Sequence, residues 1–279
     1  MNLSRAKTIL ICAFLGLNLL LCYHLFGEEM GRLTRVAVSA AELRRAVRQL
    51  EEAGYLLEAK IDRSARKSAF LTVFPYHEAG EMLRAKFAPA AAPQAGTAGT
   101  LVYESGEAKV ELHPTGLGRV EFKAGRELAG NQEPVAAVEL QLKEWGLLYP
   151  EARFDYLEGS GERGVVHYVQ LCRDMPLYSG YLKAFLENNR LWAVEIYWLQ
   201  ADEPLPEKVM EVIPATEALL QMAEHLGPSP HPRRIVKAEL GFYSRDYDAE
   251  KWEVPPVWRF LFEDGESCFV NAFTGNLES

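Results

Sequence analysis

The distribution of hydrophobic residues divides the chain into one long N-terminal apolar run and a body in which apolar and polar positions alternate. The apolar run covers residues 9–26, 18 positions without a charged side chain, and only Asn18 and His24 are strongly polar. A helix of this length would extend about 27 Å, which nearly matches a bilayer core of about 30 Å. The pattern therefore predicts a transmembrane helix at 9–26.

The charges on either side predict the orientation of this helix. Arg5 and Lys7 lie in the short segment 1–8, whereas Glu28 and Glu29 follow the span. By the positive-inside rule, segment 1–8 is cytoplasmic and the bulk of the chain is extracytoplasmic. A cleaved signal peptide is the alternative, but its apolar region is usually about 7–15 residues long and ends in a small-x-small site. The exit from this run reads YHLFGE and lacks such a site, so we expect a single-pass protein of the cell membrane.

A carboxamide in the middle of the apolar run predicts contact with a neighbouring membrane helix. Polar side chains inside a bilayer tend to face another helix, because lipid offers them no hydrogen-bond partner. Ala13 and Gly16 have small side chains that allow close approach of a second backbone. The alternative is that a strongly apolar span tolerates a single Asn. We take Asn18, Ala13 and Gly16 as candidate partner-binding residues.

Helical spacing of apolar residues predicts three helices in the body. Residues 39–42 read SAAE, the Ser-x-x-Glu form of a capping box, and apolar positions follow at helical spacing until Gly54. Two more helices begin at Pro134 and Pro214, because proline suits a first helical turn, where its missing N–H would be unpaired anyway. Their sequences, PVAAVELQLKE and PATEALLQMAE, match in pattern and indicate a weak internal repeat.

Strands are predicted around and after these helices. The segments YLLEAKI, SAFLTVF and LVYESGEAKVELHPTGLGRVEF read as short strands with turns, and each repeat helix precedes a hairpin. The hairpins turn at Asn188-Asn189 and at Asp264-Gly265, which are dipeptides that tolerate positive φ.

Each hairpin also carries an aromatic stripe. In the first, Trp192, Val194, Ile196 and Trp198 share one strand face, and in the second, residues 258, 260 and 262 are aromatic. We interpret these stripes as core faces that pack under the helices; a ligand groove is the alternative.

Together these patterns predict an α+β fold made of consecutive helix-plus-antiparallel-sheet units. The N-terminal extracytoplasmic domain is expected at 36–125, with a Pro/Ala/Gly-rich loop at 87–100. The C-terminal domain is expected at 131–279 and consists of two helix-plus-hairpin repeats, 131–200 and 205–279.

Charge limits the range of partners. The chain beyond Gly27 holds 28 basic and 39 acidic residues, a formal charge of −11. A body this acidic is a poor candidate for binding nucleic acid or anionic lipid headgroups. Two cysteines lie in the body, Cys172 and Cys268. A bridge between them is one alternative, and we favour two unpaired strand residues, because two isolated cysteines do not make a disulfide framework.

The sequence holds no motif of known catalytic chemistry. It has no Gly-x-Ser-x-Gly elbow, no phosphate-binding loop and no His-Glu-x-x-His pair. We therefore expect no catalytic residue, no cofactor and no metal, although sites do assemble from distant segments. An enzyme acting on cell-wall material is the remaining hypothesis, and it requires a polar cleft with converging carboxylates.

Both ends of the chain carry short recognisable motifs. Residues 4–9 read SRAKTI and lead into the span that holds Asn18 and Tyr23. The closing hairpin contains PVWR at 256–259, EDGE at 263–266 and VNAFTG at 270–275. These motifs resemble the YycH/YycI family of membrane-anchored regulatory proteins. The resemblance covers roughly the first 30 and the last 25 residues, and it is architectural in between.

This resemblance implies a non-catalytic accessory protein of a two-component system. Family members associate with one another and with the sensor histidine kinase WalK (also named YycG), which controls cell-wall metabolism in Gram-positive bacteria. The implied partners are a WalK/YycG kinase and a YycH-like paralogue. Their membrane helices contribute to the contact, which adds Tyr23 to Asn18, Ala13 and Gly16. The alternative is an extracytoplasmic module that binds or inhibits a peptide, a protease or a cell-envelope ligand.

Overall fold

The computed structural model describes Phe14 and residues 38–128, 133–159, 163–202, 208–245 and 249–278. The predicted span 9–26 lies outside the described residues apart from Phe14, and so do the candidate residues Asn18, Ala13, Gly16 and Tyr23. Among the helices within the described ranges, none has the length and apolarity needed to cross a bilayer.

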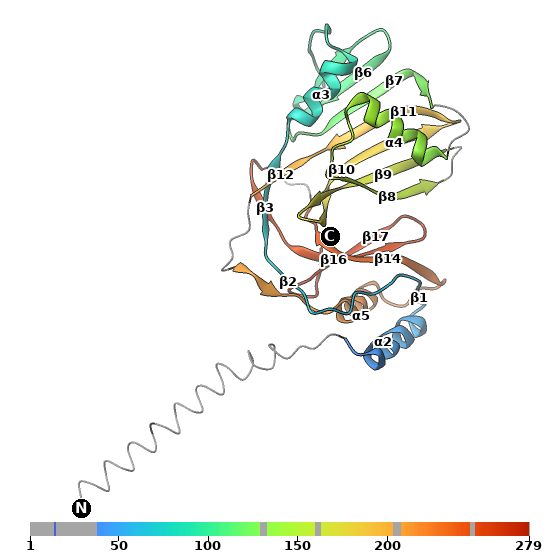
Figure 1. The fold of residues 1–279 in the computed structure, drawn as a ribbon, viewed down its shortest axis with the longest axis vertical. Helices are drawn as coiled ribbons and strands as arrows, with labels where there is room; N and C mark the ends of the chain where they lie inside the picture. The colour runs from blue at the N-terminus through green and yellow to red at the C-terminus, as the bar shows by residue number, and fades with distance from the viewer. Residues whose placement is uncertain are drawn as a thin grey trace, which may run out of the picture.

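The described residues form an α+β fold, which confirms the predicted class (Figure 1). The helices are α2 (Ala40–Glu52), α3 (Glu78–Phe87), α4 (Pro134–Trp145) and α5 (Ala215–Leu226), and residues Thr97–Gly99 form a 3₁₀ turn, η1. The strands are β1 (Tyr55–Leu57), β2 (Lys67–Ser68), β3 (Leu71–Pro75), β4 (Gln94–Ala95), β5 (Leu101–Glu104), β6 (Ala108–Leu112), β7 (Gly118–Glu127), β8 (Ala152–Gly159), β9 (Arg163–Cys172), β10 (Met175–Glu187), β11 (Arg190–Tyr197), β12 (Leu199–Ala201), β13 (Met210–Glu211), β14 (Arg233–Phe242), β15 (Trp252–Val254), β16 (Pro256–Phe262), β17 (Ser267–Asn271) and β18 (Leu277–Glu278).

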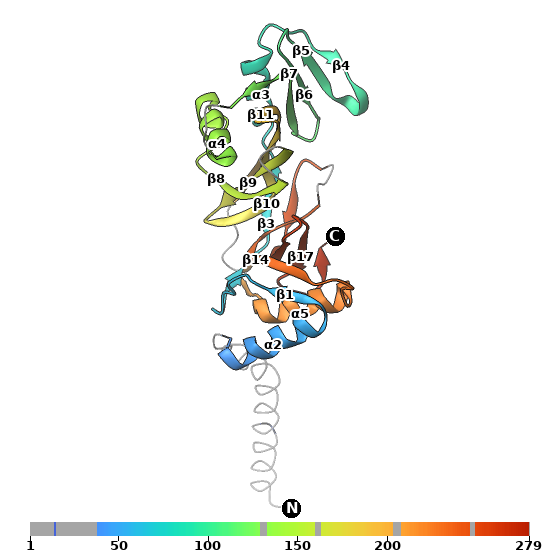
Figure 2. The same cartoon turned by 90° about the vertical axis from the view of Figure 1, so that its right-hand side faces the viewer.

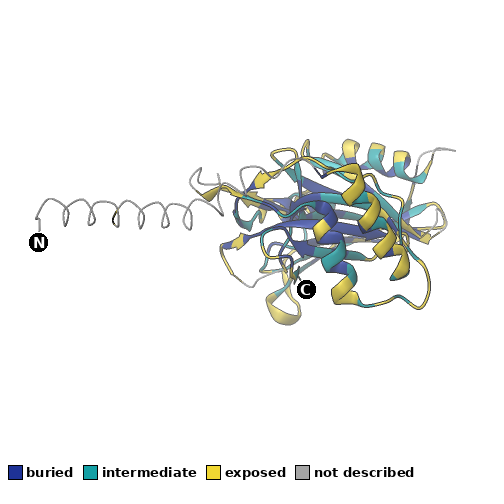
Figure 3. Ribbon diagram, turned by 90° about the horizontal axis from the view of Figure 1, so that it is seen from below, coloured by how far each residue is buried: buried dark blue, intermediate teal, exposed yellow. Residues whose placement is uncertain are grey.

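A 13-stranded mixed sheet runs through the described part of the chain. Its main path has the order β18-β17-β16-β14-β10-β11-β7-β6-β5-β4, while β9 and β8 extend from β10 and β1 adds to β14. Two smaller sheets, β12-β3-β15 and β13-β2, accompany it. The strands form the buried interior and the helices keep an exposed outer face (Figure 3).

Each repeat places its helix on one face of antiparallel strands, so both predicted helices are confirmed. In the first, Val138 and Leu142 of α4 share a buried cluster with Val194 of β11. In the second, Leu219 of α5 shares another cluster with Phe260 of β16. Burial of these apolar side chains is the main stabilising contribution to each unit.

The two predicted hairpin turns are also confirmed. Asn188 and Asn189 join β10 to β11 with φ of 51° and 58°, the pair of positive values that a tight hairpin turn of this kind needs. Gly265 has φ of 88° in the turn between β16 and β17. There the N–H of Phe262 donates to the carbonyl of Glu266 at 2.8 Å.

The aromatic stripe of β11 is buried, as predicted, at every position except its first. Val194, Ile196 and Trp198 are buried, but Trp192 is 36% exposed. Neighbouring strands pair with Leu191 and then with Ala193, so Trp192 is the extra residue of a β-bulge. A bulge breaks the alternation of faces, which explains why the prediction for Trp192 is wrong.

The N-terminal segment packs against the second repeat (Figure 2). The predicted capping box forms: the Glu42 N–H donates to Ser39 Oγ at 3.2 Å and the Ser39 N–H donates to Glu42 Oε2 at 2.8 Å. Leu50 of α2 then packs in the same cluster as Met222 of α5, and β1 pairs in parallel with β14, with Tyr55 opposite Arg233. The division into domains 36–125 and 131–279 stays a prediction, and these contacts cross it.

The predicted loop at 87–100 contains little regular structure. Within it, β4 has two residues and η1 has three, and most side chains from Pro89 to Gly99 are exposed. The strand predicted for SAFLTVF is β3, which pairs with β12 and β15.

Candidate functional site

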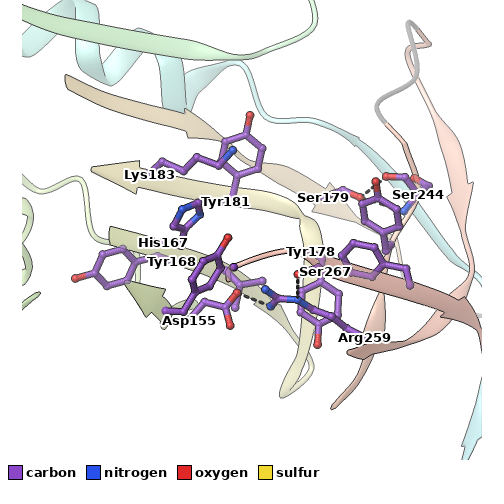
Figure 4. Close-up of a pocket in the computed structure, with 15 residues that line it drawn as sticks. Asp155, His167, Tyr168, Tyr178, Ser179, Tyr181, Lys183, Ser244, Arg259 and Ser267 are labelled. Carbon is purple, nitrogen blue, oxygen red and sulfur yellow. Dashed lines mark hydrogen bonds and ion pairs between the residues drawn. The ribbon is translucent and has the colours of Figure 1, made fainter. Parts of the chain in front are cut away.

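A groove of about 380 Å³ lies between the strands that the two repeats contribute to the large sheet (Figure 4). One wall comes from β8, β9 and β10, and the other from β16, β17 and the segment that follows β14. Most of the large side chains along it are aromatic: Tyr156, Tyr168, Tyr178, Tyr181, Tyr243 and Phe269.

A three-residue bulge in β10 shapes the floor of the groove. Leu177 pairs with Gln170 of β9, and the next pair is Tyr181 with Val169, so residues 178–180 have no opposite residue. Bulges re-aim side chains and are frequent next to binding sites. This bulge places Tyr178 and Ser179 in the groove. Beside it, Leu177 also pairs with β14, so the bulge lies where the strands of the two repeats join within the large sheet.

A second bulge places a carboxylate between the repeats. In β8, Phe154 pairs with Tyr168 and Tyr156 pairs with His167, which leaves Asp155 as the extra residue. Its side chain is directed across to the second repeat, and the residue is only 7% exposed. The bulge lets the consecutive residues Asp155 and Tyr156 both line the groove, whereas regular alternation would direct them to opposite faces.

Asp155 is held by two cations of the second repeat. Its Oδ2 forms an ion pair with Nη1 of Arg259 in β16, and its Oδ1 lies 3.0 Å from Nζ of Lys237 in β14. Arg259 is 4% exposed, and its Nε donates to Ser267 Oγ at 2.9 Å. Because both charged groups are buried, each depends on the other for compensation of its lost hydration.

The electrostatics of this cluster keep Asp155 ionised. Burial alone would raise the pKa of its carboxyl, but Arg259 and Lys237 outweigh that effect and the pKa is lowered. The guanidinium of Arg259 also lies 4.8 Å from the ring centre of Tyr178 and 5.5 Å from that of Tyr156. Arg259 is therefore fixed between a carboxylate and two aromatic rings, an arrangement that favours it as a structural cation of the groove.

The wall from the first repeat is a polar-aromatic surface. The His167 ring stacks on Tyr156 with centroids 4.2 Å apart, and its Nε2 lies 3.0 Å from Glu158 Oε2. Burial lowers the pKa of His167 more than Glu158 raises it, so the imidazole is mainly neutral at pH 7. Farther along, Nζ of Lys183 lies 4.3 Å from the ring centre of Tyr181.

The opposite wall contains stacked rings and a backbone segment that is hydrogen-bonded to Ser179. Tyr243 and Phe269 stack with centroids 3.8 Å apart, and Phe269 lies 5.4 Å from Tyr178. Ser179 Oγ donates to the carbonyl of Ser244 at 2.8 Å, which ties the bulge of β10 to the segment that follows β14. Such preformed aromatic surfaces bind peptide segments and apolar side chains at a small entropic cost.

Sequence reasoning did not identify this groove. Its candidate residues, Asn18 with Ala13, Gly16 and Tyr23, lie outside the described residues. One signal was present: Arg259 is a charged residue inside PVWRFLF, a strand whose residues are all buried. A buried charge demands a partner, and that demand points to an acidic residue elsewhere in the fold.

The two cysteines of the body do not form a bridge. Both are free, Cys172 partly exposed at the end of β9 and Cys268 buried in β17. Burial raises the pKa of Cys268 to about 11 and also raises that of Cys172. Across the ranges that the structure covers, no group of three or more His, Cys, Asp or Glu side chains is arranged to hold a metal ion.

Comparisons with known proteins reveal similarity at the level of the fold. No protein family matches the chain, and no curated protein matches its sequence. Among solved structures, an uncharacterised protein from Eubacterium rectale ATCC 33656 is similar, with 11% identity, a TM-score of 0.52, and coverage of 81% of this chain and 91% of that one. The C-terminal domain of Bacillus megaterium YpeB aligns with 12% identity and a TM-score of 0.38, over 88% of this chain and 97% of that one. At such low identity, the first of these structures shows that the fold is shared.

Proposed function

We propose that this chain is a membrane-anchored, non-catalytic regulator of a sensor histidine kinase that controls the cell wall. Its partners are a WalK/YycG kinase and a YycH-like paralogue. It acts through packing of its membrane helix and through protein contacts made by its extracytoplasmic body. The apolar run at 9–26 and the motifs at both ends of the chain support this proposal.

The observation that carries the proposal concerns the C-terminal motif. The PVWR residues form the start of β16, EDGE forms the following turn, and VNAFTG spans the end of β17 and the next turn. Asn271 Oδ1 accepts from the N–H groups of Phe273 and Thr274 at 2.9 and 3.0 Å, which fixes that last turn. The motif is thus one structural unit, and its only basic residue, Arg259, reaches the groove.

The chemistry of the groove favours binding over proton transfer. Asp155 is the only carboxylate among the residues that line it, and this group is ion-paired with a lowered pKa. A general acid needs a pKa near the working pH, and Asp155 is shifted away from it. The stacked rings of Tyr243 and Phe269 instead offer apolar faces for a partner's side chains.

Regulation through the membrane helix has a simple energetic requirement. An accessory helix alters signalling only if it binds two conformations of the kinase with unequal affinity. A difference of about 1.4 kcal/mol changes their ratio tenfold. One interhelical hydrogen bond is worth roughly 0.6–2 kcal/mol, so a bond from the carboxamide of Asn18 together with close packing of the two helices reaches this magnitude.

Co-purification of the kinase from membranes tests the proposal. Asn18→Leu is expected to weaken co-purification while leaving the amount of protein in the membrane unchanged. Phe269→Ala in the groove is expected to weaken it as well, whereas Leu140→Ala, on the exposed face of α4, serves as the matched control. Unchanged kinase recovery with both Asn18→Leu and Phe269→Ala would contradict the proposal.

The groove also supports the alternative, an extracytoplasmic module that binds a peptide, a protease or a cell-envelope ligand. Removal of residues 1–30 separates the two functions. Under the alternative, the shortened chain keeps its ligand and its effect. Under the regulator proposal, it loses control of the kinase because the membrane contact is gone.

A further inference from the structure

One end of the body has a charge opposite to that of the rest. Residues 38–67 hold seven basic and five acidic side chains, whereas the whole chain has a formal charge of −9. This segment includes α2, the outermost element at its end of the body in Figures 1 and 2. The overall acidity of the chain therefore hides a basic surface at the end where the described body begins.

The basic surface follows from the amphipathic pattern of α2. Ala46 and Leu50 are buried and direct one face of the helix toward α5. Arg44, Arg45 and Arg48 lie on the opposite side of the helix, and all three are exposed. The arginines thus form one outward-facing group in the first three turns, and the exposed Glu51 and Glu52 follow on the same side in the last turn.

These three arginines differ from others in the body in lacking a carboxylate partner. Arg153, Arg233 and Arg259 each form ion pairs with acidic side chains. Arg44 and Arg48 have no ion pair within the described part of the chain, and neither does Arg45. Their charge is therefore available to an external anion.

A second segment extends the basic surface. The Val38 N–H donates to the carbonyl of Arg63 at 2.9 Å, and Arg63 Nε donates back to the Val38 carbonyl at 2.9 Å. These bonds hold the segment before β2 beside the start of α2. Arg63 itself is exposed, as are Lys60 and Lys67.

We propose that the basic face of α2, formed by Arg44, Arg45 and Arg48, docks on the anionic lipid headgroups of the membrane that residues 9–26 cross. This inference rests on the proposed function, which supplies the membrane anchor. Only 13 residues, 27–39, connect the predicted span to α2, so the helix begins within about 45 Å of the end of the span. Basic residues close to an anionic membrane surface bind it, and the acidic remainder of the body is repelled.

Docking would fix the direction in which the body faces. Because one end of an acidic body is basic, the orientation with that end toward an anionic surface is favourable. The electrostatic attraction acts over about 8 Å at physiological salt. In Figure 2, β14 and β17 lie between α5 and the strands of the first repeat. The groove is lined by strands of both repeats and by no residue of α2 or α5. In this orientation the groove is held away from the bilayer and is open to the extracytoplasmic part of a partner.

Arginine labelling of the full chain tests the proposal. The chain is reconstituted in nanodiscs of phosphatidylcholine or of phosphatidylglycerol, and phenylglyoxal modification is followed by mass spectrometry. Labelling of Arg44, Arg45 and Arg48 is expected to be roughly fivefold slower in the anionic discs, from about 1 kcal/mol per arginine near such a surface. In 1 M salt the difference should vanish. Arg126 and Arg190, on β7 and β11 of the first repeat, are the internal controls and should label equally in both lipids.

A second measurement distinguishes loss of charge from misfolding of a variant. Amide exchange of residues 40–52 is compared between the two lipids for the full chain, for R44Q/R45Q/R48Q and for R44K/R45K/R48K. The lipid difference should disappear in the glutamine variant and persist in the lysine variant, because lysine keeps the charge.

The outcomes separate this proposal from the function on which it rests. Equal rates of arginine labelling in both lipids would overturn the docking proposal. Slow labelling in both lipids that does not change with salt would overturn it too, because it would indicate that the arginines contact protein. Recovery of the chain in the membrane fraction after an alkaline carbonate wash reports on the anchor alone. Release by that wash would overturn the anchor, whereas retention with equal labelling would overturn only the docking of α2.

Discussion

Replacing Arg259 by methionine would remove the buried cation that joins the two repeats. Arg259 contacts Asp155, which comes from the other repeat, and both residues are almost fully buried. Methionine has a similar length but no charge, so Arg259→Met changes the electrostatics more than the packing. Lys237 would remain, at 3.0 Å from the same carboxylate, as its only cationic partner.

The expected cost follows from the burial of the pair. Removing one partner of a buried ion pair typically costs about 3–5 kcal/mol, because the remaining charge stays buried and uncompensated. With a urea dependence of about 3 kcal/mol/M, the midpoint of unfolding should fall by roughly 1–1.7 M. Adding Asp155→Asn to Arg259→Met should recover much of this loss, since no buried charge is then left without its partner.

Urea unfolding of the full chain in detergent, followed by tryptophan fluorescence, measures these shifts. Arg234→Met is the matched control: this arginine lies on β14 and pairs with Glu58 and Glu263, but its side chain is 48% exposed. Exposed pairs contribute about 1 kcal/mol or less, so the control should shift the midpoint little.

The pH dependence provides an independent check. The folded-state pKa of Asp155 is lowered, so its stabilising contribution is present above the unfolded pKa of about 3.9 and is lost as the pH falls through the folded value. Arg259→Met removes a main cause of that lowering. The difference in the free energy of unfolding between the natural chain and the variant should therefore narrow from pH 7 to pH 3. A loss below 1 kcal/mol, or a difference that does not change with pH, would refute this account of the pair.

Three further substitutions and labelling experiments test other parts of the fold. Ser39→Ala removes the capping box of α2 and should lower the free energy of unfolding by about 1 kcal/mol, measured by urea titration. Gly180→Ala would bring a new Cβ to 2.1 Å from a hydrogen-bonded side-chain oxygen and should cost about 1–3 kcal/mol, whereas Gly106→Ala, which meets nothing within 4 Å, should be nearly neutral. At pH 8, a thiol reagent should modify Cys172 much faster than Cys268, because burial raises the pKa of Cys268 to about 11; equal rates by mass spectrometry would contradict this burial.

The elements that sequence reasoning identified are those specified by neighbouring residues. The SAAE capping box, the helix starting at Pro134 and the Asn188-Asn189 turn each depend on residues within about one helical turn of one another. The conformation that these neighbouring residues favour locally is the one found in the fold, so the sequence pattern is sufficient to predict these elements. The α+β class follows from the order of these elements.

The groove could not be predicted in the same way because it depends on distant segments and on bulges. Asp155 and Arg259 are 104 positions apart in the sequence, and Tyr55 and Arg233, which pair between β1 and β14, are still farther apart. A bulge changes which face each later side chain occupies, and no local signal marked it at Asp155 or at Trp192. Trp192 therefore left its predicted face, and Asp155 reached a partner that no periodicity would indicate.

Strand β14 connects the two surfaces on which the proposals depend. At one end it pairs with β1, which follows α2 directly, and nearer its middle it supplies Lys237 to Asp155 at the edge of the groove. Glu239, two residues farther on, forms a bidentate ion pair with Arg153 of the first repeat at 2.7 Å for each bond. Because β14 lies inside the large sheet and has ladder hydrogen bonds to β1 and β16, it acts as a rigid connection between the basic end and the groove. Attachment of α2 to lipid would then determine where the groove points without any change in its shape, and a partner would detect the orientation of the body.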